Sequence, residues 1–413
     1  MSEQRREVDF RHLVTGIDHV VDQGMGTLVD EEKAVRDVAN AVLQGLGEQL
    51  NITGARVYRK ASKSHYRLID AFPEGAGANR GLLVAADYPP IELANCNRVI
   101  YMPQGDPRTD LELEEKLGVS EFAAIEIGAE AYVVAFDIGK DVDSEDLVYA
   151  LAVLRHSIND RLRSERIADV LAEARRIQTS ILPRRVPKFG VFDLAARSEP
   201  VDVVGGDFYD FIPIGDNNLG TAIADSSGHG LAAAMQVRDI HMGLRMGLSQ
   251  DFKIARTVER MNRIIHHGAL TSRFVSLFYG ELDHTGLFIY VNAGHPPPLF
   301  VNDDGKVRQL KANGPVLGPL ADAKYEWGFV NLKPGCSVVM CTDGILEAQQ
   351  GGTGQEFGQE RLVSTVLEWQ QRSASEIVHR IFSQVDDFLD GAPLADDRTV
   401  VVVKHPRSAE EGA

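Results

Sequence analysis

The segment ADSSGHGLAAAM, residues 224–235, joins a predicted strand to a predicted helix through one sharp polar turn. The stretch that leads into this turn, LGTAIADSS (residues 219–227), is mostly apolar, and residues 231–248 carry apolar side chains at helical spacing. Ser226, Ser227 and Gly228 are residue types that open a helix as caps. Asp225 is therefore expected at the end of a buried strand, directly before a helix N-terminus.

Three further aspartates occupy the same kind of boundary between an apolar strand and a turn. Asp207 lies in VGGDFYDF, Asp343 in VVMCTDGILEA and Asp396 in LADDRTVVVV. Strands without helical crossovers between them favour an antiparallel-rich layered α+β fold, which can bring all four aspartates to one rim. The expected strands are residues 191–200, 207–214, 219–227, 273–283, 286–294, 337–343 and 398–405, and the expected helices are 231–248 and 252–268.

Aspartates gathered at one rim need a counter-charge, because like charges in a partly dry site repel each other. Carboxylate oxygens without a Cys or His triad suit Mg²⁺ or Mn²⁺ better than Zn²⁺. Two such ions side by side can activate water and clamp the oxygens of an in-line displacement at phosphorus. The pattern therefore predicts phosphate ester hydrolysis with two Mn²⁺ or Mg²⁺ ions as cofactors.

Five motifs, in this order, resemble those of the PPM-type metal-dependent protein serine/threonine phosphatases: VDVVGGDFYDF, ADSSGHGLAAAM, NAGHPPPLF, CTDGILEAQ and DDRTVVVV. The most similar branch is the bacterial one of the sporulation stage II protein E and the stress-response phosphatases of partner-switching pathways. The resemblance covers roughly residues 174–405. It implies an α/β/β/α layered catalytic domain and a phosphoserine or phosphothreonine substrate on a partner protein, a STAS-domain anti-sigma-factor antagonist.

The resemblance also assigns roles to individual residues. Asp225 matches the aspartate that bridges both metals, and the backbone carbonyl of Ser226 matches the adjacent main-chain ligand. Asp343 and Asp396 match the remaining ligands of the first metal, and Asp207 matches the acidic residue that holds the second. His229 stands two positions beyond the histidine that serves as general acid in eukaryotic relatives, so catalytic and structural roles both remain open for it.

Other polar residues near these motifs have simpler interpretations. Asp397 is expected to support the ligands, Asn292 to hold a turn with His295 beside the site, and Glu347 to lie on the exposed or supporting side of the helix after Asp343. Asp210 is expected to be a turn or cap residue, since Asp favours such positions.

The amino-terminal part has a different organisation. Residues 1–143 show helices, a meander of strands and a closing helix, an order that resembles a GAF domain with an unknown ligand or partner, with a PAS domain as the alternative. Residues 144–185 form a helical linker with two apolar stripes, and residues 186–406 form the phosphatase domain, followed by a disordered tail at 407–413. The three-four spacing of the second stripe predicts a coiled-coil homodimer; it comprises Ile167, Val170, Ala174, Ile177 and Ile181.

Bulk properties exclude several other classes. The formal net charge of −17 argues against nucleic acid or an anionic membrane as a partner. The three cysteines form no CxxC pair, and no apolar run has the length of a bilayer span, so a cytoplasmic protein is expected. Two alternatives remain: a diguanylate cyclase, because GGDFYD is similar to GGDEF, and a non-enzymatic signalling module with a phosphatase fold.

Overall fold

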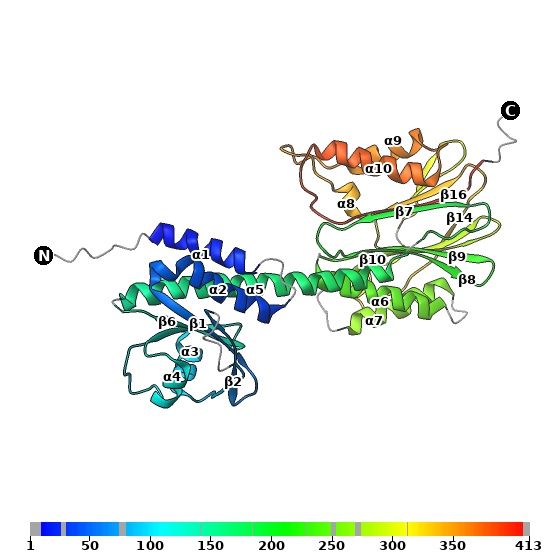
Figure 1. Cartoon of the computed structure of the whole chain (residues 1–413). Helices are drawn as coiled ribbons and strands as arrows, with labels where there is room; N and C mark the ends of the chain where they lie inside the picture. Colours follow the sequence, from blue (N-terminus) through cyan, green and yellow to red (C-terminus); the bar gives the residue numbers. More distant parts are fainter. Residues whose placement is uncertain are drawn as a thin grey trace. The chain divides into compact units, whose positions relative to one another are not determined.

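The computed structural model describes residues 10–25, 30–73, 80–140, 142–183, 185–228, 230–248, 253–268, 274–311 and 313–407. Its contacts divide the chain into two compact units, Met1–Asp169 and Val170–Ala413 (Figure 1). Among the described helices, none combines the length and the apolar character needed to cross a membrane.

The amino-terminal unit is built on a six-stranded antiparallel sheet of order β3-β2-β1-β6-β5-β4. Helices α1, α2 and the first part of α5 pack on one face of this sheet, and α3 and α4 lie against the other. The strands are β1 Ile52–Lys60, β2 His65–Phe72, β3 Leu83–Ala85, β4 Val99–Met102, β5 Phe122–Ile127 and β6 Tyr132–Ile138; the helices are α1 Phe10–Met25, α2 Glu31–Leu50, α3 Pro89–Asn97, α4 Leu111–Leu117 and α5 Ser144–Ile181.

The expected meander of strands was incomplete, because α3 and α4 interrupt it. Helix α3 begins at Pro89 and has little amphipathic character, so periodicity gives no signal for it. Helix α4 is only seven residues long and is recognisable mainly by its cap, Asp110, whose side chain accepts hydrogen bonds from two backbone amides.

Helix α5 carries the two predicted stripes, and they have different environments. The first stripe is buried in the core of the amino-terminal unit and comprises Leu147, Leu151, Leu154, Ile158 and Leu162. In the second stripe, Ile167, Val170 and Ile177 each expose about half of their surface. The division between the two units falls inside α5, between Asp169 and Val170.

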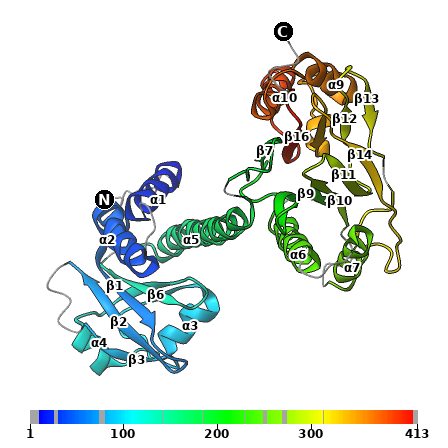
Figure 2. The same cartoon turned by 90° about the vertical axis from the view of Figure 1, so that its right-hand side faces the viewer.

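The carboxy-terminal unit contains two five-stranded antiparallel sheets, of order β14-β11-β10-β9-β8 and β13-β12-β15-β16-β7 (Figure 2). Their strands are β7 Asp193–Glu199, β8 Asp207–Ile214, β9 Asn218–Ser226, β10 Val275–Asp283, β11 Leu287–Ala293, β12 Leu299–Val301, β13 Val307–Gln309, β14 Gly328–Asn331, β15 Ser337–Cys341 and β16 Arg398–Lys404. An apolar core that includes Phe278 and Met340 fills the space between the sheets.

Helices cover both outer faces of this pair of sheets. Helices α6 (Leu231–Leu248) and α7 (Ile254–His267) cover the first sheet, and α9 (Gly358–Glu368) and α10 (Ala374–Leu389) cover the second. The side chains of strand β16 alternate between these two environments. Val400 and Val402 pack on the helical side, and Val401 and Val403 pack against the other sheet. The predicted α/β/β/α layering is present, although α9 and α10 were not among the expected helices.

Candidate metal centre

Two of the predicted aspartates lie directly opposite each other at one end of the first sheet. Asp207 begins β8, Asp225 is the penultimate residue of β9, and the two are register partners. Opposed residues of an antiparallel pair project from the same face of the sheet, so the two carboxyl groups are neighbours. Burial raises the pKa of Asp207 well above its ordinary value, and repulsion from Asp225 raises it further.

Asp343 and Asp396 come from the second sheet and face the same region. Asp343 opens the short helix α8 (Asp343–Leu346) immediately after β15, and Asp396 lies two residues before β16. Burial raises the pKa of Asp225 to about 7, and the next causes are the charges of Asp343, Asp396 and Asp397. Within the described residues, however, no three His, Cys, Asp or Glu side chains are close enough to form a complete ion cage.

Thr342 holds Asp207 in place and connects the two sheets. Its hydroxyl donates to Asp207 Oδ2 at 2.8 Å and accepts from the backbone N–H of Thr399 at 2.9 Å. Sequence analysis missed this residue, and its position beside Asp343 in CTDG is the only signal that could have indicated it.

Asp397 organises the backbone next to the ligands. Its carboxylate accepts hydrogen bonds from the N–H groups of Val201, at 2.7 Å, and Gly206, at 2.5 Å. Gly206 in turn accepts from the N–H of Ser226 at 3.1 Å. A Cβ atom at Gly206 would lie 2.7 Å from the carbonyl oxygen of Ser226, so only glycine allows this close approach.

Ser226 is fully buried, and its hydroxyl donates to the side chain of Gln236 on α6. Gln236 was not predicted from the sequence. His229, the candidate general acid, lies outside the described residues.

Asn292 and His295 form a hydrogen-bonded turn at the end of β11. The Asn292 amide donates to the carbonyl oxygens of His295 and Leu310, both at 3.1 Å, and accepts from the N–H of His295 at 2.9 Å. His295 Nδ1 lies 2.9 Å from the hydroxyl of Ser276, the register partner of Asp225. Burial lowers the pKa of His295 to about 3, so its imidazole is neutral at physiological pH.

The structure places Glu347 at an exposed position and Asp210 at a buried one. Glu347 is exposed at the C-terminal end of α8. The prediction for Asp210 was wrong: it lies within β8, is buried, and forms an ion pair of 2.9 Å with Arg245 on α6. The alternation of β8 places Asp210 on a covered face, which the sequence alone did not reveal.

The donor set fits a hard divalent cation. The nearby groups are carboxylate oxygens and the main-chain carbonyl of Ser226, the oxygen donors that Mg²⁺ and Mn²⁺ prefer. Cys341, two residues before Asp343, is buried, and burial raises the pKa of its thiol to about 12.

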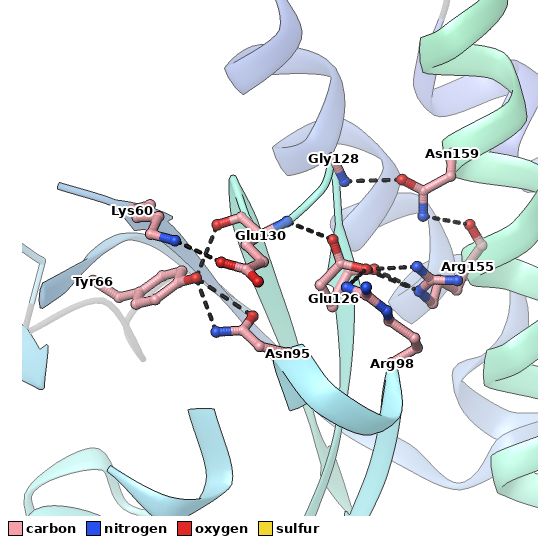
Figure 3. Close-up of polar contacts among 9 residues, drawn as sticks. All are labelled: Lys60, Tyr66, Asn95, Arg98, Glu126, Gly128, Glu130, Arg155 and Asn159. Atoms are coloured by element: carbon pink, nitrogen blue, oxygen red, sulfur yellow. Dashed lines mark hydrogen bonds and ion pairs between the residues drawn. The ribbon is translucent and has the colours of Figure 1, made fainter. Parts of the chain in front are cut away.

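The amino-terminal unit has a polar network of its own, which fastens the β5–β6 turn to α5 (Figure 3). Buried Glu126 on β5 pairs with Arg155 of α5 at 2.6 Å and with Arg98 at 3.3 Å. The N–H of Gly128 donates to Asn159 of α5 at 2.9 Å. A displacement of this turn would therefore act directly on α5.

The same unit has a small, partly open pocket between its sheet and helices α3 and α4. Buried Arg56 and Glu114 contribute its polar groups, and Tyr88 donates to Glu114 Oε1 at 2.6 Å. Its volume of about 20 Å³ is the space that one water molecule needs.

Comparison with known proteins gives a family match for part of the chain and several more distant relatives. Residues 215–406 match the family described as Stage II sporulation protein E (SpoIIE). Protein IcfG of Synechocystis sp. is 28% identical, with 56% of this chain and 41% of that protein covered. Phosphoserine phosphatase RsbU of Bacillus subtilis is 26% identical, with 62% of this chain and 76% of that protein covered. The chain thus spans less than half the length of IcfG and about three quarters of RsbU.

A solved structure agrees at the level of the fold. The SiaA-PP2C domain of Pseudomonas aeruginosa superimposes with a TM-score of 0.53 at 22% identity, covering 59% of this chain and 98% of that domain. The resemblance inferred from the five motifs is thereby confirmed. The carboxy-terminal unit thus has the fold of a PP2C domain, its residues 215–406 match the stage II sporulation protein E family, and the chain is similar in sequence to the phosphatases RsbU and RsbP of Bacillus subtilis.

Proposed function

We propose that this chain is a metal-dependent protein-serine/threonine phosphatase that hydrolyses phosphoserine or phosphothreonine on a partner regulatory protein. The observation that carries the proposal is the opposition of Asp207 and Asp225, with Asp343 and Asp396 close enough to raise the pKa of Asp225. A region of such repulsion is stable in its charged form only beside cations. The name of the relative RsbU, a phosphoserine phosphatase, supports the choice of substrate.

In the proposed centre, Asp225 would contribute to holding both Mn²⁺ or Mg²⁺ ions, the carbonyl of Ser226 and the carboxylates of Asp343 and Asp396 would hold the first, and Asp207 would hold the second. When bound, the ions supply an activated water and neutralise charge on the phosphoryl group. The residues of the chain orient this centre: Thr342 fixes Asp207, and Asp397 fixes the Gly205–Gly206 backbone.

We further propose that the amino-terminal unit is a GAF-like sensor that controls the phosphatase domain through α5. The Glu126–Arg155 and Glu31–Arg166 ion pairs connect the sensor sheet and α2 to this helix. The exposed residues Ile167, Val170 and Ile177 are proposed to join two copies of the chain as a homodimer, since their spacing suits a coiled-coil seam. The proposed substrate is a phosphorylated STAS-domain anti-sigma-factor antagonist.

The test is release of phosphate from a phosphoserine STAS-domain protein by the full chain, with Mn²⁺, with Mg²⁺ and with EDTA. Turnover that requires the metal and is lost in D225N is the expected result. Binding of the phosphoprotein without turnover would instead identify a docking module with a phosphatase fold.

A further inference from the structure

Asp225 has a second neighbour in its own sheet, on the side away from Asp207. Ser276 of β10 is the register partner of Asp225, and its side chain is buried. Both side chains project into the space between the two sheets, because Ile223 and Phe278, two positions along the same strands, lie in the core that fills this space. Opposed Cβ atoms on antiparallel strands are about 4.5–5.5 Å apart, so the Ser276 hydroxyl is within reach of the Asp225 carboxylate.

A serine hydroxyl has one proton to donate, and His295 competes for the proton of Ser276. His295 Nδ1 lies 2.9 Å from Ser276 Oγ, and the ring is 2% exposed. A neutral imidazole carries its proton on one nitrogen and accepts at the other. Burial lowers the pKa of His295, and contact with the backbone of Cys341 partly opposes this shift, so that backbone acts as the acceptor of a ring proton. The contact is a weak one, since Nε2 forms no hydrogen bond of ordinary geometry with any described residue.

The carboxylates around Asp225 differ from it in their hydrogen bonding. Asp207 accepts from Thr342, and Asp397 accepts from two backbone N–H groups. Among the described residues, none donates a hydrogen bond to the Asp225 carboxylate, although the hydroxyl of Ser276 is close enough to do so. In this arrangement the Asp225 oxygens keep their lone pairs for another ligand.

We propose that His295 is a positioning residue that accepts the hydroxyl proton of Ser276 at Nδ1 and thereby keeps this hydroxyl from donating to Asp225. This inference rests on the proposed function and deepens it, because Asp225 is expected to contribute to holding both ions. Hydrogen bonds to a carboxylate are about twice as strong as those between neutral groups, and one from Ser276 would have to break before an ion could bind. Asn292 fixes the ring in place by closing the turn around the backbone of His295.

Removing the acceptor should weaken metal binding, and removing the hydroxyl as well should restore it. H295L keeps a buried apolar side chain but leaves Ser276 free to turn toward Asp225, so Mn²⁺ affinity should fall at least about tenfold, the scale on which groups behind metal ligands act. The double variant H295L/S276A has no hydroxyl left to donate, and most of the lost affinity should return. S276A alone should bind Mn²⁺ as wild type does, because the hydroxyl itself holds no ion.

H405L is the matched control. His405 is also a partly buried histidine, and its Nδ1 lies 2.7 Å from the carbonyl oxygen of Leu332, at the end of β16 away from Asp396. This variant removes a comparable ring and hydrogen bond without freeing a donor beside the aspartates, so its Mn²⁺ affinity should match wild type.

The experiment measures Mn²⁺ affinity of the full-length wild type and variants by titration calorimetry. Wild-type affinity in H295L, or an H295L/S276A chain that binds as weakly as H295L, would overturn this inference alone, since the second result would show that His295 acts only as a structural support. If H295L does not fold, ¹⁵N NMR of the wild-type chain tests the same point, with the His295 ring assigned through its own backbone signals. A proton on Nε2 and none on Nδ1 is expected, and a proton on Nδ1 would overturn the inference. A wild-type chain that binds no Mn²⁺ would overturn the proposed function as well.

Discussion

Removing the charge of Asp225 should stabilise the metal-free protein while abolishing its response to metal. Burial and the neighbouring carboxylates raise the pKa of Asp225 from 3.8 to about 7. A carboxyl group whose pKa is raised on folding binds its proton more tightly in the folded state, so its favourable contribution is present at low pH and is lost as the pH rises through 7. One pKa unit corresponds to about 1.4 kcal/mol. Ionised Asp225 therefore lowers the free energy of unfolding of the metal-free protein by roughly 4 kcal/mol at pH 8.

The D225N variant carries no charge at this position at any pH. In the presence of EDTA it should exceed wild type in the free energy of unfolding by roughly 4 kcal/mol at pH 8, and by only about 1.5 kcal/mol at pH 5, where Asp225 is still protonated in the folded state. Added Mn²⁺ at pH 8 should stabilise wild type and have little effect on D225N, because ligand binding to the folded state raises its stability.

Urea unfolding followed by tryptophan fluorescence measures this difference selectively. The chain has two tryptophans, Trp327 and Trp369, and both lie in the carboxy-terminal unit, so the signal reports that unit alone. D322N, at an exposed position, is the control and should show no pH-dependent gain. A D225N variant no more stable than wild type at pH 8 would refute the idea that the carboxylates repel one another there.

Three further outcomes are expected. D343N should reduce turnover of a phosphoserine protein by at least about a hundredfold while the circular dichroism spectrum is retained, and wild type in EDTA should be inactive until Mn²⁺ is restored. T342V should lower the free energy of unfolding by ~1–3 kcal/mol, measured in urea, because it leaves buried Asp207 and the N–H of Thr399 without their shared partner. The double variant V170D/I177D should be monomeric by light scattering where wild type is dimeric; a monomeric wild type would remove the basis for the proposed coiled-coil seam.

Local patterns in the sequence were sufficient to place several strand ends and the aspartates beside them, although they did not reveal helices α9 and α10. Apolar runs bounded by glycine or a turn mark strand ends, and the side chain of an aspartate at such an end must lie at a sheet edge; Asp207, Asp225 and Asp343 were found in this way. Helix α2 shows the same relation between spacing and burial, since its apolar residues at helical spacing are all buried: Val35, Val38, Val42, Leu46 and Leu50. Periodicity reports which face of an element is covered, and that information is contained within a few residues of the chain.

The polar contacts that organise the site are of a different kind, and only the tertiary structure decided them. Thr342 reaches Asp207 across 135 residues, Arg245 reaches Asp210 across 35 and Gln178 reaches Gly205 across 27. Each pair forms because two sheets, or a helix and a loop, pack against each other. A donor buried by that packing then needs an acceptor among the groups that surround it. No local pattern encodes which distant group that will be, so the sequence determined where the acidic rim lies, while packing between distant segments determined what holds it in place.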